Sequence, residues 1–297
     1  MIKPLLTAAA LLLLAVSPAA ARDAAWVTPY LQRLVQPTNA ARFDALKKLL
    51  EEKGVAYTVH AFPGSKESGG VPGNNIVVTI GNGPRDLVVT AHYDAEKLAD
   101  GTLVEGVVDN GASTVALVKL AEAAKAMGLK HRLVIVFFDQ EELGLLGSAA
   151  WIKSIDKSRI DAVVNFDVAG YGDTVIYGGL KNDPSGKIGT AMEIVCLRRA
   201  VDCMRFPIYP PSDDRSFAAA GVPVISIGVQ PAADAHQMWL LMNRGKDAGL
   251  APGVMPRVFT LIHTPEDKMS AIEPAAVDLA FNIARNMATA LDTAFPL

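Results

Sequence analysis

Short runs of apolar residues alternate along the chain with longer segments in which apolar residues recur every three or four positions. The short runs are Leu87–Ala91, Leu133–Phe138, Ala162–Phe166, Val222–Val229 and Val258–Ile262. Their length and their β-branched and aromatic residues are typical of buried strands of a parallel sheet. The longer segments that predict helices include Ala40–Lys53, Thr114–Met127, Gly186–Val201 and Pro274–Ala294. Strands that alternate with helices predict an α/β chain with a mostly parallel sheet.

Two segments before these runs predict an antiparallel hairpin at the edge of the sheet. Tyr57–Phe62 alternates apolar and polar residues, and Asn75–Ile80 follows it after a glycine-rich loop. Both patterns are typical of strands. His60 alternates with apolar neighbours in the first segment, so we interpret it as structural. His131 stands before the central strand, at its amino end, and we expect it on the surface.

A long irregular segment, Gln230–Pro256, separates the last two predicted strands. One short helix, Ala235–Arg244, is predicted within it. A long loop beside a sheet often forms a lid or a pocket wall, although a simple surface excursion would have the same pattern.

The N-terminus has the pattern of a secretory signal peptide. Lys3 supplies a positive start, Leu5–Val16 is apolar, and Ala19–Ala21 offers small residues for cleavage. The apolar run is short for a membrane span, so an uncleaved anchor helix is the weaker alternative. We expect residues 1–21 to be removed, and the remaining residues 22–297 to form a single domain in the periplasm or the medium.

Composition and charge narrow the classes of protein that remain. The chain has 297 residues, of which 51% are hydrophobic and 20% charged, which is enough to form a large core. The formal charge is −3 and no cluster of Lys or Arg stands out, so the sequence indicates neither a nucleic-acid partner nor an anionic membrane surface. Its two cysteines, Cys196 and Cys203, are expected to form a disulfide in an oxidising compartment, with a catalytic thiol as the minor alternative.

Acidic residues follow the central strand without a linker. Asp139, Glu141 and Glu142 come directly after Leu133–Phe138. A parallel sheet places its ligands outside the carboxyl ends of its strands, which is where these acids are predicted to lie. Taken alone, they could equally cap the next helix and face solvent.

Other strand ends and the loops between them carry the same residue types. The residues concerned are His92 and Asp94, Asp109, Asp167 and His263. Taken alone, each histidine could be paired with a nearby acid, and each acid could belong to a turn or cap a helix. Together, two histidines and several carboxylates at one edge of a sheet indicate a metal site, in which a nearby carboxylate can fix the tautomer of an imidazole ligand.

Imidazole and carboxylate ligands suit zinc, with manganese or cobalt as possible substitutes. The number of ligands exceeds one open zinc site and fits two metals that share a carboxylate and a water molecule. Glu141 and Glu142 could then divide two tasks, one as general base and one as ligand. A glycine-rich phosphate loop and a Gly-x-Ser-x-Gly elbow are both absent from the sequence, which argues against nucleotide and serine-hydrolase chemistry.

Six segments resemble one family in its own order: AHYDA, VVDNGAS, FFDQEELGLLGS, NFDVAG, SDDRSF and HTPEDKM. The family is that of the co-catalytic zinc exopeptidases that include bacterial leucyl aminopeptidases, metallopeptidase family twenty-eight. The resemblance implies a three-layer α/β/α sandwich and two zinc ions. It implies these roles: His92 and Asp167 on one metal, Glu142 and His263 on the other, Asp109 as the bridge, Glu141 as general base, and Asp94 as the partner of His92.

The sequence departs from the family pattern at one motif. The family commonly has Ser-Asp-His where this chain has Ser212-Asp213-Asp214. The departure concerns the edge of the pocket, so Asp213, Asp214 and Arg215 are candidate substrate-binding residues.

The function we expect is that of an exported, monomeric zinc aminopeptidase acting on peptides with a free N-terminus. The acidic rim could hold the α-amine of the substrate. A carboxypeptidase or dipeptidase would need a basic group for a carboxylate, and Arg215 is the candidate. Two more rival functions are a glutaminyl cyclase, for which one zinc suffices, and a non-catalytic protein that binds peptides through a metal.

Overall fold

A single eight-stranded sheet runs through the centre of the protein in the computed structural model, which describes residues 24–251 and 253–297. The predicted signal peptide lies outside the described residues. The strand order is β1-β2-β4-β3-β5-β8-β6-β7. The strands are β1 (Thr58–Phe62), β2 (Gly73–Ile80), β3 (Asp86–His92), β4 (Arg132–Phe138), β5 (Ile160–Phe166), β6 (Thr174–Lys181), β7 (Cys203–Phe206) and β8 (Val224–Gln230).

The middle of the sheet is parallel, as predicted. The strands β4, β3, β5 and β8 run the same way, and Val88 on β3 pairs with Val134 on one side and Val163 on the other. The predicted edge hairpin is confirmed, because β1 pairs antiparallel with β2 at one edge. At the other edge β6 runs antiparallel to β8, and the unpredicted strand β7 runs parallel to β6.

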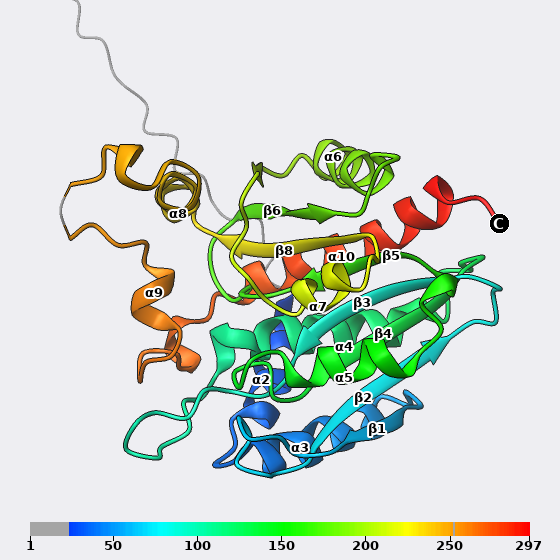
Figure 1. The fold of residues 1–297 in the computed structure, drawn as a ribbon, viewed down its shortest axis with the longest axis horizontal. Helices are drawn as coiled ribbons and strands as arrows, with labels where there is room; N and C mark the ends of the chain where they lie inside the picture. Colours follow the sequence, from blue (N-terminus) through cyan, green and yellow to red (C-terminus); the bar gives the residue numbers. More distant parts are fainter. Residues whose placement is uncertain (1–23, 252) are drawn as a thin grey trace, which may run out of the picture.

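Helices cover both faces of the sheet (Figure 1). One face carries α2 (Val27–Leu34), α3 (Asn39–Glu52), α4 (Ala112–Ala124), α6 (Lys187–Arg199) and α10 (Pro274–Ala294). The other face carries α5 (Leu146–Ser154), α7 (Asp214–Ala219) and α8 (Ala232–Arg244). Helix α9 (Val258–Leu261) and five short turns complete the described part of the chain, the turns being Ala24–Trp26, Val107–Gly111, Lys157–Arg159, Gly245–Ala248 and Met269–Ala271. These layers agree with the expected α/β sandwich.

The alternation of side chains along the strands explains the two faces. Leu87 and Val89 on β3 belong to the core under α4 and α10, whereas Val88 belongs to the core under α5 and α7. Successive residues of a strand point to opposite faces, so a strand covered on both sides reads as a continuous apolar run.

One predicted strand is wrong. Val258–Ile262 forms the short helix α9 and not a strand of the sheet. Val258 is buried in a small core with Tyr209 and Met238, which packs on β6 and β7. An apolar run of five residues fits a buried strand or one buried turn of helix equally well, and tertiary packing decides between them.

The expectation for His131 is also wrong. Its side chain is buried between Asp161 and Asp292, with Nε2 3.0 Å from one carboxylate and Nδ1 2.8 Å from the other. This cluster lies at the amino end of β4, opposite the predicted site.

Two further features concern a covalent link and the apolar character of the helices. Cys196 on α6 and Cys203 on β7 are joined in a disulfide. Among residues 24–251 and 253–297, none of the helices combines the length and apolar character needed to span a bilayer.

Candidate metal centre

The predicted ligands meet at the carboxyl ends of the parallel strands. His92 ends β3, the two glutamates follow β4, and Asp167 follows β5. Asp109 arrives on the turn Val107–Gly111, and His263 follows α9. Figure 1 shows α8 and α9 beyond this same end of the sheet.

Asp109 lies between the two histidines. Its Oδ1 atom is 3.1 Å from Nε2 of His92, and its Oδ2 atom is 3.2 Å from Nε2 of His263. Each carboxylate oxygen therefore faces a different imidazole, which is the arrangement that a bridging ligand needs.

Each histidine also faces a carboxylate of its own. Nε2 of His92 is 3.5 Å from Oδ1 of Asp167, and Nε2 of His263 is 3.0 Å from Oε2 of Glu142. The two groups share Asp109 and match the two ligand sets that the family resemblance implies.

The donor atoms fit metal ions because they converge, and several of them are buried without hydrogen bonds. Nε2 of His92, Oδ1 of Asp167 and Oε1 of Glu142 are buried and have no hydrogen-bond partner among the described residues. Buried polar atoms without partners are costly unless a ligand satisfies them. Potential ligand atoms of His92, Asp109 and Glu142 lie within 4.8 Å of one another, as do those of His92, Glu141 and Asp167. This donor set suits zinc.

Glu141 lies beside the first group of ligands and is largely buried. In the metal-free protein, burial raises the pKa of Glu141, and the carboxylates of Asp213, Asp167 and Asp109 raise it further against the opposing effect of His92. Burial together with Asp109 likewise raises the pKa of Glu142. Divalent cations would offset this concentration of negative charge.

Asp94 connects the two sides of the centre. Its Oδ1 atom is 3.3 Å from Nδ1 of His92. The same carboxylate accepts the backbone N–H of Glu141 at 3.1 Å and that of Glu142 at 3.2 Å. One buried side chain thus lies beside an imidazole and holds the backbone of both glutamates, which is the position of an outer-shell carboxylate in metal sites.

Asp267 holds the turn that carries Asp109, a role that the sequence analysis did not assign. The side chain is fully buried, and it accepts the backbone N–H groups of Val107, Val108 and Asp109 at 2.9, 2.7 and 3.0 Å. Asp267 belongs to the HTPEDKM segment, so its position close to His263 in the sequence was the signal that could have found it.

Asn110 connects the same turn to the end of β5. Its Nδ2 atom donates to the carbonyl of Phe166 at 2.9 Å, and its Oδ1 atom accepts the N–H of Val168 at 3.2 Å. Phe166 and Val168 flank Asp167, and Asn110 directly follows Asp109. These two hydrogen bonds therefore fix the position of Asp109 relative to Asp167.

Arg42, on α3, is a buried cation beneath the centre that the sequence analysis also missed. It donates only to backbone carbonyls, including Tyr93 at 2.7 Å and Gly106 at 3.0 Å. Burial lowers the pKa of Arg42 to about 10, while the carboxylates of Asp94, Asp267, Asp109 and Glu142 oppose that shift. The signal was present in the sequence, because Arg42 falls four residues before Leu46 on the apolar stripe of the helix.

An apolar pocket of about 130 Å³ opens beside the ligands. Its lining combines Asp109, Glu141, Glu142, Asp167 and His263 with apolar and aromatic residues of the β6, α8 and α9 region, among them Ile176, Tyr209, Met238, Val258 and Phe259. No Lys or Arg lines this pocket among the described residues. We call it the metal pocket.

The three candidate substrate-binding residues do not line the metal pocket. Asp213 is fully buried, where burial raises its pKa to about 7 and its charge in turn affects Glu141. Asp214 turns back to accept the backbone N–H of Ser212 at 2.9 Å. Both aspartates are thus buried, and neither belongs to the lining of the metal pocket.

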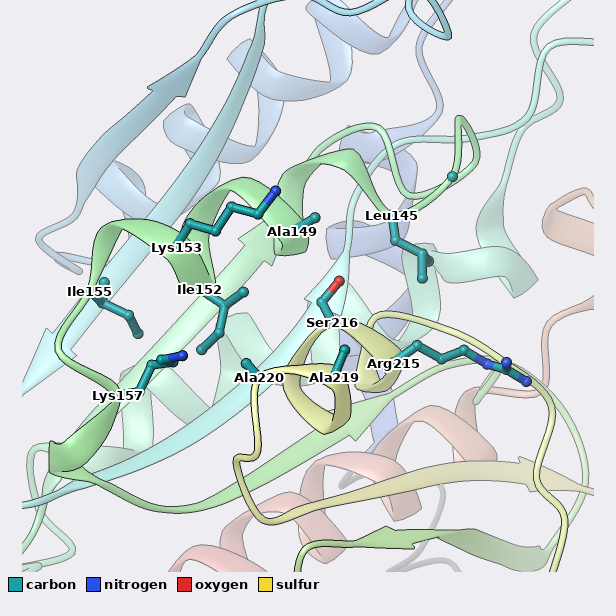
Figure 2. Close-up of a pocket in the computed structure, with 11 residues that line it drawn as sticks. Leu145, Ala149, Ile152, Lys153, Ile155, Lys157, Arg215, Ser216, Ala219 and Ala220 are labelled. Atoms are coloured by element: carbon teal, nitrogen blue, oxygen red, sulfur yellow. The ribbon is translucent and has the colours of Figure 1, made fainter.

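Arg215 points outward, contrary to the expectation that it contacts substrate. It is exposed and lines a groove between α5 and α7 on the outer face of the protein. Figure 2 shows Arg215 at one end of this groove and Lys157 at the other. The side chain lies on the solvent side of α7 because Phe217, two residues later, occupies the core.

Comparison with known proteins gives one family match. The model of peptidase family M28 matches residues 75–288. Aminopeptidase YwaD of Bacillus subtilis is 30% identical over 86 residues, which are 29% of this chain and 18% of that protein. The chain spans 18% and 37% of the lengths of the two curated relatives that it matches.

Solved structures share the fold at low identity. BSAP, a zinc aminopeptidase from Bacillus subtilis, superposes with a TM-score of 0.58 and 20% identity, over 73% of this chain and 50% of that one. The glutaminyl cyclase of Porphyromonas gingivalis superposes with a TM-score of 0.68 and 18% identity, over 92% of this chain and 98% of that one. At these identities the likeness supports the fold, and chemistry has to be argued from the site.

Proposed function

Since this chain belongs to peptidase family M28, we propose that it is an exported zinc aminopeptidase that removes N-terminal residues from peptides. A metal-dependent hydrolase fits the donor set described above. The relatives named for aminopeptidase activity support the choice among peptidase reactions.

One observation carries the proposal: the metal pocket combines a carboxylate cluster with apolar walls and has no Lys or Arg in its described lining. A peptide's N-terminal residue brings a cationic amine and a side chain into such a site. The amine is attracted by the carboxylates, and an apolar side chain is accommodated by residues such as Ile176, Met238 and Phe259.

Glu141 is the residue that would move the proton. Glu141 lies within the ligand cluster and is largely buried. Its carboxylate would therefore exchange protons with water and substrate in a surrounding of low dielectric constant. As general base it takes the proton of the attacking water and delivers it to the leaving amine. Asp94 fixes the backbone of Glu141, which limits its freedom to leave this position.

Two zinc ions would be held by His92 with Asp167 and by Glu142 with His263, with Asp109 shared between them. Bound zinc supplies Lewis-acid polarisation of the scissile carbonyl and lowers the pKa of water. The fold likeness to a zinc aminopeptidase supports the choice of metal, and the two imidazoles that flank Asp109 support a count of two.

Export is part of the proposal and rests on the N-terminal pattern. Lys3, the apolar run that follows it and Ala19–Ala21 fit a signal peptide. The Cys196–Cys203 disulfide is typical of proteins in oxidising compartments. We place the mature enzyme in the periplasm or the medium, as a monomer.

Two rivals on the same scaffold are weaker. A carboxypeptidase needs a cation for the substrate's carboxylate, and Arg215 faces the outer groove instead of the metal pocket. A glutaminyl cyclase is favoured by the fold likeness to the Porphyromonas gingivalis protein. It would need one zinc ion and would cyclise N-terminal glutamine without releasing a residue.

The deciding experiment is the hydrolysis of aminoacyl-nitroanilides by the mature protein, each with and without an N-terminal acetyl group. The assays are run before and after chelation, with zinc added back. We expect cleavage of free-amine substrates only, lost on chelation and restored by zinc. Equal cleavage of acetylated substrates would refute the aminopeptidase assignment. A fully metallated protein that converts a substrate with N-terminal glutamine into its pyroglutamyl form and ammonia, and releases no amino acid, would support the cyclase instead. Peptide binding without either product would indicate a binding protein.

A further inference from the structure

A second cavity, of about 610 Å³, shares Glu142 in its lining with the metal pocket. Its lining includes Val71, Asn74, Tyr93, Gln140, Glu142 and Leu143. We call it the distal cavity. Glu142 is therefore a wall common to both spaces, and Asp94 also lines the distal cavity. A peptide that places its first residue in the metal pocket and continues past Glu142 would enter the distal cavity.

The walls of the distal cavity are tied to the metal centre by hydrogen bonds. Asn39 on α3 donates to the carbonyl of Ala95 and accepts its N–H, both at 2.9 Å. Tyr93 donates to the carbonyl of Asn74 at 2.8 Å, and Asp139 accepts the N–H of Asn74 at 2.9 Å. These walls are fixed by the same segments that carry His92 and Glu141, so the cavity is organised before a ligand arrives.

The lining of the distal cavity holds exposed apolar residues beside polar and charged ones, which include Glu96 and Lys97. Val71 is 61% exposed and Leu143 is 41% exposed, although both are large hydrophobic residues. Phe43 and Leu103 add apolar surface to the lining. Apolar side chains that stay exposed around a cavity are expected where an apolar group of a ligand will cover them.

A buried acceptor accompanies this rim of exposed apolar residues. The amide nitrogen of Gln140 donates to the carbonyl of Val71 at 3.2 Å, but its Oε1 atom is buried and has no hydrogen-bond partner among the described residues. A backbone N–H of a bound peptide is a donor that would satisfy this oxygen.

From these observations, and resting on the proposed aminopeptidase function, we propose that the distal cavity binds the part of the peptide beyond the scissile bond. The ligand class is an extended peptide with a large apolar residue in its second position. Much of the lining, from Pro37 to Asn74, precedes the segment matched by the family model, which begins at residue 75. Part of the cavity is therefore built by N-terminal segments that lie outside the matched range.

The test compares amidated dipeptides that share an N-terminal leucine, leucyl-phenylalaninamide and leucyl-glycinamide, on the zinc-loaded full mature chain. We expect kcat/KM to favour the phenylalanine substrate by about 10- to 200-fold, the range for an apolar group in a pocket. Val71→Asp should reduce this preference at least tenfold, mainly through KM, because a charge on the rim opposes the apolar side chain. Leu143→Asp, at the other exposed apolar residue of the lining, should act in the same direction. Leu197→Asp is the matched control, since Leu197 is 81% exposed on α6, away from the cavity.

Two results would overturn the proposal. One is an unchanged preference at the second position in both rim variants. The other is a rim variant whose preference between leucinamide and alaninamide differs from that of the wild type. These substrates differ only in their first residue, so such a change would place the first residue in the distal cavity. These results are distinct from failure of the proposed function, in which the zinc-loaded wild type cleaves none of the free-amine substrates.

Discussion

The backbone N–H of Asp109 donates to Oδ2 of Asp267 at 3.0 Å, although 158 positions separate the two residues in the chain. Asp267 is fully buried and also accepts the N–H groups of Val107 and Val108. The carboxylate that faces both histidines is thus positioned by a second carboxylate that touches neither of them in the described contacts. The metal centre depends on this contact between the start of α4 and the loop after α9.

Replacing Asp267 tests that dependence. The Asp267 carboxylate only accepts hydrogen bonds, and it accepts three backbone N–H groups. In Asp267→Asn one of its two oxygens is replaced by an NH2 group, which would face these backbone donors as a donor itself. We expect zinc affinity to fall at least tenfold, about the effect of losing an outer-shell partner, as measured by competition with a chromogenic chelator. Glu266→Gln is the matched control, because Glu266 is an exposed neighbour. Equal affinity in Asp267→Asn and wild type would refute the positioning role.

Glu141→Gln should separate catalysis from metal binding. The amide cannot accept the water's proton, so we expect kcat to fall by about two to four orders of magnitude. Zinc content, measured by mass spectrometry of the dialysed protein, should stay at the wild-type value. Normal turnover would remove Glu141 from the mechanism, and loss of zinc would make it a ligand.

Arg42 should be essential for stability. Arg42→Met leaves the carbonyls of Leu34, Tyr93, Glu105 and Gly106 without their donor. We expect the free energy of unfolding in urea to fall by about 3 kcal/mol or more, with Arg42→Lys in between. Arg33→Met is the control, since Arg33 makes an exposed pair with Glu52 that is worth less than about 1 kcal/mol. Equal losses in Arg42→Met and Arg33→Met would contradict the assignment.

The buried cluster around His131 predicts an acid limit to stability. Burial acts to raise the pKa of Asp161, but hydrogen bonds from Arg85 and His131 lower it below its ordinary value. Burial also acts to raise the pKa of Asp292, but hydrogen bonds from the backbone and the side chain of His131 lower it below its ordinary value. Because both pKa values are lowered in the folded state, their stabilisation is complete above the ordinary aspartate pKa of about 4 and is lost as the pH falls through the folded values.

Urea unfolding between pH 7 and pH 3 measures this effect. The double variant Asp161→Asn, Asp292→Asn should be less stable than wild type at pH 7 and should lose less stability on acidification. Asp44→Asn, at an exposed position on α3, should follow the wild-type curve. A double variant with the wild-type pH dependence would show that other carboxylates set the acid limit.

Removal of metal should destabilise the fold. Without a cation, the carboxylates of Asp109, Glu141, Glu142 and Asp167 repel one another, and burial raises the pKa of both glutamates. We therefore expect a chelator to lower the melting temperature and zinc to restore it, since a ligand that binds only the folded state stabilises it. An unchanged melting temperature would mean that the centre binds no metal under those conditions.

Much of the molecule could be predicted from the sequence because the relevant signals are local. Each parallel strand is covered on both faces, so β3, β4, β5 and β8 read as apolar runs, and polar residues at their ends mark one edge of the sheet. The six segments from AHYDA to HTPEDKM are also local patterns, and they placed His92, Asp109, Glu141, Glu142, Asp167 and His263 in one family of sites. The structure brings these six residues together at that edge.

Contacts between distant segments decided the rest. Val258–Ile262 has the composition of a strand, yet it packs on Tyr209 and Met238 as a helix, because its own residues do not reveal whether the sheet has a place for another strand. His131 is buried by Asp161 and Asp292, and Arg215 faces outward because Phe217 fills the core. The sequence by itself determined which residue types stand at the strand ends. Only the tertiary structure decided which buried charges, Arg42 and Asp267 among them, hold those ends in place, since such partners are chosen by proximity in space and not by spacing along the chain.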